Sequence, residues 1–390
     1  MIINKDFVSM LSAILCLIVV QPVSGQETDR DSSFVLYNYE GEILRDSNWG
    51  KIAAFQRALS DSLRACEENG IATDGLFGPK TQDGLIRILS CPGFEDLAVT
   101  SDHPLHGTVH SKLWKRLLPN TPIPTVHERA FALVLTREGT DYNDVEWNYG
   151  TRDDKSALTW GPYGATAGWG NEVRGILKRV HTNDPDLLKD LFEGEYSMVE
   201  DLIQKDADQG YEVLKPVHSD TVRRQIWETG LQKLGSSVEG REAYDWYAFR
   251  SEKWLKPNLR LLYRLIPNAE QKATEVDYAF FLDIGLHALV NSTRIDKAKE
   301  AIEAKQEESA GSLTPSERRR MIGQVFAERV DAEWQKDRRG RNVTFYVDGI
   351  GKNNLTQEEV DAWEDRWPPR LRASHFGLSD HRKYYPEFLE

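Results

Sequence analysis

The amino-acid sequence predicts a mainly α-helical protein with a small β region, an α+β fold in two domains. Apolar residues recur at helical spacing through most of the 390 residues. Residues 141–170 depart from this spacing and are rich in Gly, Thr and aromatic side chains, which is typical of short strands and turns. A proline-containing linker, residues 120–124, separates a short first domain (residues 26–119) from a longer second domain (residues 125–390).

Residues 1–25 have the pattern of a secretory signal peptide. Lys5 precedes an apolar run over residues 7–20, and residues 23–25 offer a cleavage site before Gln26. The run is short for a membrane span, which needs about 20 apolar residues. We therefore expect a secreted or periplasmic protein that leaves the membrane after cleavage, with a retained single anchor as the alternative.

Charge and motif content exclude several classes of function. The net charge is −13, so no basic surface is predicted to gather the phosphates of nucleic acid or of anionic membranes. The sequence contains no His-x-x-x-His, no Cys-x-x-Cys and no Gly-rich phosphate loop. No metal or nucleotide cofactor is predicted.

The core of the first domain, about residues 48–119, begins with an amphipathic helix at residues 52–59. A turn at residues 74–81 follows, with the sequence Asp-Gly-x-Phe-Gly-Pro-x-Thr, and a second helix runs to about residue 89. A third helix is expected to start near residues 109–114. This order resembles the small three-helix peptidoglycan-binding domain of cell-wall hydrolases. The resemblance implies that Thr81 caps the second helix and that the domain binds cell wall, or else serves as a folding spacer.

Cysteine usage predicts one disulfide bond. Cys16 lies in the signal segment, which leaves Cys66 and Cys91 in one small exported domain. Such a pair favours a disulfide, with two free thiols as the alternative.

The second domain is predicted to begin with a helix that ends at Glu138. Thr125 and Glu128 fit a capping box, and Gly139 follows the last turn. Glu138 shares a helical face with three apolar residues, Phe131, Val134 and Leu135. Burial and the helix dipole both favour the protonated acid, so the pKa of Glu138 is predicted to rise, as a proton donor to a glycosidic oxygen requires. The alternative is a solvated glutamate at a frayed helix end.

The predicted β region carries both acids and aromatic rings. Its acids are Asp141, Asp144, Glu146, Asp153 and Asp154. Its large aromatic residues, which we expect to bind sugar rings, are Trp147, Tyr149, Trp160, Tyr163 and Trp169. Acids can supply a base, and aromatic faces suit the apolar faces of sugars.

Glu138, Asp154 and the run Thr159-x-Gly-x-x-Gly resemble the pattern of inverting chitosanases in the lysozyme-like superfamily. The resemblance implies a lysozyme-like helical domain with a small β-hairpin lobe. It also implies that Glu138 is the acid, that Asp154 is the base and that Thr159 helps to hold the water. Phage-type lysozymes have a related pattern, in which the Asp lies six residues before the Thr, and that pattern selects Asp153.

Only one of Asp153 and Asp154 can face a cleft if the segment is extended, because neighbouring side chains of a strand point to opposite faces. The glycine spacing after Thr159 resembles that of the chitosanases and is one residue too long for the phage lysozymes, and this resemblance favours Asp154. If neither acid acts, the next candidates are Asp144, Glu146 and Glu172.

Helical patterns dominate the rest of the chain: residues 172–180, 187–208, 221–234, 243–265 and 274–290. Residues 279–286 are apolar on nearly all sides and are expected to form a buried central helix. Asp283 and His287, one turn apart, are interpreted as a buried structural pair, with catalysis as the alternative.

From residue 294 the chain is predicted to be charged and helical to about residue 335, and looser beyond it. Basic clusters occur at residues 318–320 and 338–341. We expect these clusters to form a solvated face, or else to pair with carboxylates of the domain or of a substrate.

Together these features predict a secreted hydrolase that cleaves the β-1,4 glycan of peptidoglycan. A hydrolase of chitosan with the same catalytic residues is the second interpretation, favoured by the acidic net charge because chitosan is a polycation. The third is a non-catalytic wall-binding protein that has kept a lysozyme-like fold.

Overall fold

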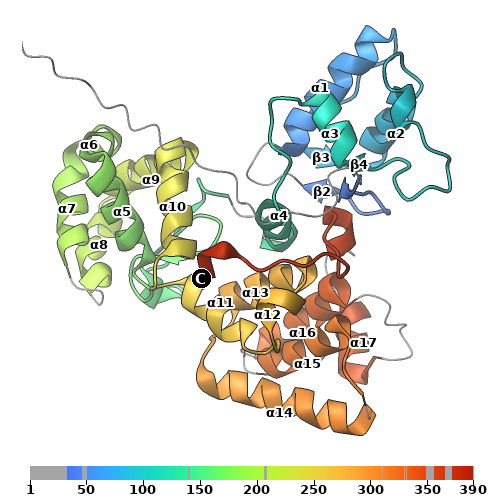
Figure 1. The fold of residues 1–390 in the computed structure, drawn as a ribbon. Coiled ribbons are helices and arrows are strands. Elements are labelled where there is room, and N and C mark those ends of the chain that lie inside the picture. Colours follow the sequence, from blue (N-terminus) through green and yellow to red (C-terminus); the bar gives the residue numbers. More distant parts are fainter. Residues whose placement is uncertain are drawn as a thin grey trace, which may run out of the picture. The chain divides into compact units, whose positions relative to one another are not determined.

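Helices make up most of this protein, with 63% of residues helical and 6% in strands that form small sheets (Figure 1). The structure is a computed structural model. It describes residues 33–45, 51–138, 141–205, 209–309, 311–328, 330, 332–347, 355–364 and 371–389. The prediction of a mainly α fold is confirmed. The predicted signal segment lies outside the described residues.

Three helices and two small sheets make up the chain before the predicted linker. The helices are α1 (Lys51–Ala65), α2 (Pro79–Ile88) and α3 (Ser111–Leu117). The antiparallel strand pairs are β1 (Val35–Tyr37) with β4 (Val109–His110), and β2 (Leu44–Arg45) with β3 (Leu76–Phe77). The helices enclose a core that includes Phe55 and Trp114, whose rings stack 5.6 Å apart.

The turn before α2 differs from the prediction in one respect. Gly78, not Thr81, occupies the N-cap of α2, and Pro79 starts the helix. Thr81 lies buried inside the first turn of α2, where its Oγ1 accepts a hydrogen bond of 3.0 Å from Gln56. The side-chain oxygen of Gln56 in turn accepts from the amide of Gly75, at φ +72°. Thr81 therefore fixes α1 to the glycine turn and does not cap α2.

Cys66 and Cys91 form the predicted disulfide bond, with their Cα atoms 5.8 Å apart. Cys66 directly follows α1, and Cys91 follows α2 by three residues. The bond joins the carboxyl ends of two packed helices, so this prediction is confirmed.

α4 (Val126–Glu138) has the predicted boundaries. The Thr125 amide donates to the Glu128 carboxylate at 2.7 Å, and the Glu128 amide donates to Thr125 Oγ1 at 3.1 Å. This reciprocal pair is the predicted capping box.

The β region forms a three-stranded antiparallel sheet. Its strands in order are β5 (Val145–Trp147), β6 (Leu158–Trp160) and β7 (Ala165–Thr166). The short 3₁₀ helix η2 (Asp154–Ser156) lies in the connection between β5 and β6. Gly161 adopts φ +76° in the tight connection between β6 and β7, where the ring of Tyr244 leaves no room for a Cβ.

Helices follow the sheet, and two predicted long helices are each broken. They are α5 (Glu172–Asn183), α6 (Pro185–Phe192), α7 (Tyr196–Gln204), α8 (Gly210–Ser219), α9 (Thr221–Ser236), α10 (Val238–Arg250) and α11 (Leu255–Tyr263). The helix predicted over residues 187–208 is broken at Glu193, which adopts φ +46°. The helix predicted over residues 243–265 is broken after Ser251, whose extended backbone ends α10. Both single-helix predictions were wrong, because apolar spacing continued across the breaks.

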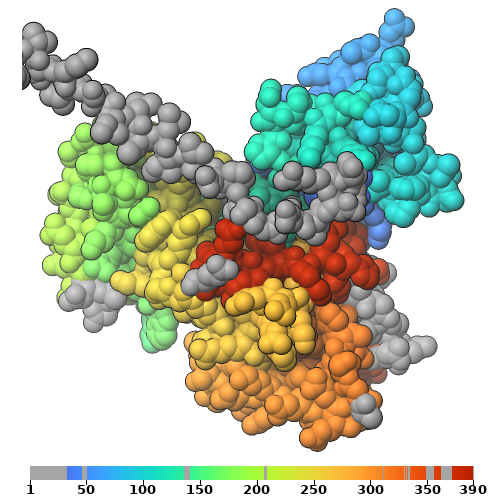
Figure 2. Space-filling view, in the orientation of Figure 1, coloured from blue at the N-terminus to red at the C-terminus, as the bar shows by residue number. Residues whose placement is uncertain are grey.

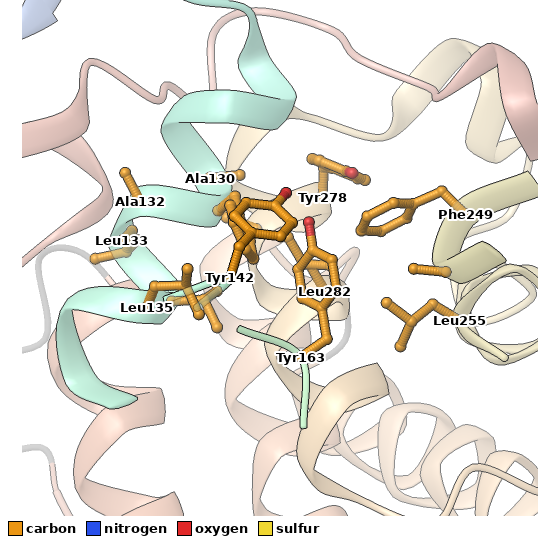
Figure 3. Close-up of a cluster of buried hydrophobic side chains, with 14 of the residues drawn as sticks. Ala130, Ala132, Leu133, Leu135, Tyr142, Tyr163, Phe249, Leu255, Tyr278 and Leu282 are labelled. Atoms are coloured by element: carbon orange, nitrogen blue, oxygen red, sulfur yellow. The ribbon is translucent and has the colours of Figure 1, made fainter. Parts of the chain in front are cut away.

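α13 (Glu275–His287), which follows the single-turn α12 (Ala269–Lys272), is the predicted buried helix. Thr274 and Asp277 cap it with a second capping box. Figure 3 shows Tyr278 and Leu282 of this helix near Ala130 of α4. The Nδ1 atom of His127 in α4 and the hydroxyl oxygen of Tyr278 lie 2.5 Å apart. α4 is thus packed on the central helix.

The helices after α13 are α14 (Ser292–Ser309), α15 (Pro315–Ala327), α16 (Ala332–Arg341) and α17 (Gln357–Glu364), with a π-helical turn η5 (Asn342–Tyr346). Helix therefore continues past residue 335, where looser structure was predicted. Among the helices that the structure describes, we find none both long and apolar enough to span a bilayer.

The first basic cluster is not a solvated face. Arg319 of α15 is fully buried and forms ion pairs with Asp277 (2.8 Å) and Asp380 (2.6 Å). Arg320 pairs with buried Glu359 at 2.5 Å. The expectation of a solvated face was wrong here, and the alternative, pairing with carboxylates of the domain, is confirmed.

Asp283 is a buried structural carboxylate, as predicted, although its main partners differ from the predicted one. It accepts hydrogen bonds from Arg341 at 2.7 Å and from the Tyr346 hydroxyl at 3.0 Å. The ring of His287 lies farther away, at 3.6 Å. Burial lowers the pKa of His287 well below its usual value.

The carboxy-terminal residues 371–389, red in Figure 2, contact several earlier elements. Arg129 of α4 is buried, lies 3.4 Å from the Glu275 carboxylate and donates to the carbonyl oxygen of Phe376 at 2.9 Å. The amide of Asn38 donates to the carbonyl of His375 at 2.8 Å. The last segment therefore ties α4 and α13 to β1, and residues 33–390 form one compact unit.

Candidate active site

α4 ends at Glu138 after burying one apolar face. Phe131, Val134 and Leu135, the residues predicted to share that face, are fully buried. The backbone of Glu138 is the last of the helix. Its side chain lies outside the described residues, so the predicted raised pKa of Glu138 stays a prediction.

A half-buried polar group lies between α4 and α10. Asp245 of α10 accepts a hydrogen bond of 2.6 Å from the Tyr142 hydroxyl and one of 3.4 Å from the Tyr163 hydroxyl. Burial raises the pKa of Asp245 to about 7. Figure 3 shows Tyr142 and Tyr163 side by side, next to α4. Asp245 was not predicted from the sequence, because α10 and residues 142–163 are distant in the chain.

The sheet presents one polar row on its outer face. Glu146 pairs with Thr159 and Thr159 pairs with Thr166 across the three strands. Directly paired residues of an antiparallel sheet share a face. The alternating residues Leu158 and Trp160 are buried, whereas Thr159 and Thr166 are half-buried and Glu146 is exposed. The amide group of buried Asn148 donates to Thr159 Oγ1 at 2.8 Å, which fixes that hydroxyl.

Asp153 and Asp154 do not lie in an extended segment. They lie at the start of the 3₁₀ helix η2, so the argument that they point to opposite faces of a strand was wrong. Asp154 accepts hydrogen bonds on both oxygens, from the Gly150 amide at 2.7 Å and from the Tyr211 hydroxyl at 3.0 Å. The Gly150 amide and the Tyr211 hydroxyl lower the pKa of Asp154. Asp153 is exposed, and among described residues no hydrogen bond joins either acid to Thr159.

Two of the five predicted sugar-binding rings are core residues. Trp160 is fully buried and donates its Nε1 hydrogen to the Tyr142 carbonyl at 2.7 Å. Tyr163 is 6% exposed and packs on Phe131 of α4, with ring centroids 4.5 Å apart. Their burial leaves no face for a ligand, so their predicted role in binding sugar is corrected to support of the sheet.

The other three predicted rings remain accessible in part. Trp147 and Tyr149 stack with centroids 6.3 Å apart, and His218 of α8 packs against both. Trp147 pairs with Leu158, so it lies on the face opposite Thr159. Trp169 is 77% exposed, and the Lys155 ammonium lies 5.4 Å from its ring centroid. Trp169 is thus the predicted ring that is most open to a ligand.

Glu172, the first residue of α5, completes the polar row at the β7 edge. Its Oε2 accepts hydrogen bonds from the Thr166 amide at 3.0 Å and from Thr166 Oγ1 at 2.9 Å. Burial raises the pKa of Glu172, against the opposing effect of these hydrogen bonds. Sequence reasoning named Glu172 only as a fallback and missed Thr166. The register of a hairpin turning at Gly161 would have placed Thr166 beside Thr159.

Among the described residues no group of three or more His, Cys, Asp or Glu side chains is placed to hold a metal ion. Comparisons of the chain with models of protein families, with curated proteins and with solved structures found no match.

Proposed function

We propose that this protein is a secreted, lysozyme-like glycoside hydrolase that cleaves β-1,4 bonds of peptidoglycan by general acid–base catalysis. One observation carries the proposal. A helix packed on a buried central helix ends at a glutamate, and a three-stranded sheet with two threonines and one glutamate on its outer face follows directly. Protonation of a glycosidic oxygen requires a carboxylic acid, and the general acid–base mechanism requires a second carboxylate near it.

In this proposal Glu138 protonates the bridging oxygen, and a second carboxylate activates the attacking water. The sequence resemblance assigns the base to Asp154, with Asp153 as the alternative, and gives Thr159 a part in holding the water. The fixed Thr159 hydroxyl supports the last role, because its hydrogen bond from Asn148 leaves its own proton free to donate. An acid and a base about 6.5 to 9.5 Å apart would invert the anomeric centre.

Chitosan is the second candidate substrate. The net charge of −13 favours it, because an acidic protein attracts a polycation. The three helices before the linker favour peptidoglycan, because they follow the order found in peptidoglycan-binding modules.

Purified protein incubated with murein sacculi and with chitosan, in parallel, tests the proposal. We expect reducing ends to appear from murein and at a lower rate from chitosan. Turnover of chitosan alone would move the substrate to the second candidate. Binding to sacculi without any new reducing ends would show instead a non-catalytic wall-binding protein and would overturn the proposed hydrolase.

A further inference from the structure

Glu172 has one oxygen fixed and one oxygen open. Thr166 donates two hydrogen bonds to Oε2, whereas no other residue that the structure describes donates a hydrogen bond to Oε1. The side chain is half-buried and not fully enclosed. A carboxylate held by one oxygen keeps its geometry and can still exchange a proton through the other.

The chain around Glu172 leaves space for this carboxylate. A Cβ at Gly170 would lie 2.0 Å from Oε1, so a side chain there would displace the glutamate. The Gly170 amide donates to Thr166 Oγ1 at 2.8 Å, and that hydroxyl donates to Glu172. The direction of the Thr166 hydroxyl is therefore set, because its oxygen accepts from Gly170 and its hydrogen goes to the carboxylate.

Asp154 lacks these features. Both of its oxygens accept hydrogen bonds within the protein, from a loop amide and from Tyr211 of α8. These bonds stabilise the charged form and oppose uptake of a proton. The geometry of Asp154 is that of a carboxylate which fastens the β5–β6 connection to α8.

We propose that Glu172, anchored by Thr166 beside Thr159, is the carboxylate that removes the proton from the attacking water. The inference rests on the proposed hydrolase function. In the step, Glu138 gives its proton to the leaving oxygen as the C1–O bond breaks. The water oxygen bonds to C1, and its proton passes to Oε1 of Glu172; both acids then return to their starting states by exchange with solvent.

The electrostatic surroundings suit this role. Among the described residues, the hydroxyls of Tyr244 and Tyr247 of α10 interact electrostatically with Glu172, and burial raises the pKa of both. They are neutral near pH 7, and no cation is among the causes of the shift at Glu172. Burial therefore makes Glu172 a stronger base than an exposed glutamate.

Azide rescue tests the assignment. Glu172→Ala should lower turnover of soluble murein glycan strands, or of chitosan hexasaccharide if only chitosan is cleaved, by roughly a hundredfold or more. Sodium azide, which needs no base, should restore part of the rate and yield a glycosyl azide of inverted configuration. Glu242→Ala, at an exposed site on α10, is the control and should neither lose activity nor respond to azide.

A conservative second variant keeps the test independent of folding. Thr166→Val removes the hydroxyl donor to the anion, so the pKa of Glu172 rises and the acidic limb of the kcat/KM profile should move to higher pH. Azide rescue of Asp154→Ala instead of Glu172→Ala would overturn the inference, as would an unmoved acidic limb in Thr166→Val. Wild-type protein without turnover on either glycan would reject the hydrolase itself, which is a distinct result.

Discussion

At the scale of single residues, the hydrogen bonds of Asp154 indicate a structural role in the β5–β6 connection. Its two oxygens bind the Gly150 amide and the Tyr211 hydroxyl, and Tyr149 also donates to the carbonyl of Tyr211. These contacts join the β5–β6 connection to α8.

We expect Asp154→Asn to keep turnover and to loosen this connection, because the neutral amide is a weaker acceptor than the carboxylate. Hydrogen exchange at the Gly150 amide should become faster in the variant, while amides of α13 exchange at the wild-type rate. An inactive variant with unchanged exchange would return Asp154 to the role of base.

The raised pKa of Asp245 predicts a specific dependence of the unfolding free energy on pH. Its folded pKa of about 7 lies above the value of an unfolded aspartate, so the folded state binds the proton more tightly. The contribution to stability is full below about pH 4 and is lost as the pH rises towards 7. The unfolding free energy that Asp245 contributes, and that is lost over this pH range, is on the order of 2 to 4 kcal/mol at most.

The comparison with Asp245→Asn isolates this effect. The difference in unfolding free energy, wild type minus variant, should fall between pH 4 and 7 and stay constant above it. Burial lowers the pKa of His127 to about 4, which acts in the opposite direction, but His127 is present in both proteins and cancels. A difference that does not change with pH would show that Asp245 is charged throughout this range.

At the scale of elements, local sequence patterns correctly predicted the features that contacts between neighbouring residues determine. The Thr125–Glu128 capping box placed the start of α4, and the Gly-rich, aromatic stretch placed the sheet. The breaks at Glu193 and Ser251 were missed because each lies within continuous apolar spacing. A break of this kind depends on how flanking helices pack, which sequence periodicity does not contain.

The disulfide bond is an element-scale feature that the sequence did predict. Replacing Cys66 and Cys91 by Ala should lower the unfolding free energy by roughly 3 to 4 kcal/mol, because the bond closes a loop over a separation of 25 residues. Denaturant unfolding of the oxidised, the reduced and the doubly substituted protein measures this. The reduced protein and the double variant should agree, and two thiols titrating in the native oxidised protein would contradict the bond.

At the scale of the whole molecule, the contacts that were not predictable are long-range. Arg319 meets Asp277 and Asp380 across 42 and 61 residues, and nothing local marks these partners. The same reason explains the candidate site. Glu138 was identified from the pattern of its own helix. The role proposed for Glu172 depends on its hydrogen bond from Thr166 and on the sheet register that brings Thr166 beside Thr159.

The central claim is that the acid at the end of α4 drives cleavage of a β-1,4 glycan. Glu138→Gln keeps the size of the side chain and removes the proton, so it tests the claim most directly. With murein glycan strands as substrate, we expect kcat to fall by roughly two orders of magnitude or more, with an unchanged melting temperature. Hydrolysis by Glu138→Gln at near the wild-type rate would contradict the account.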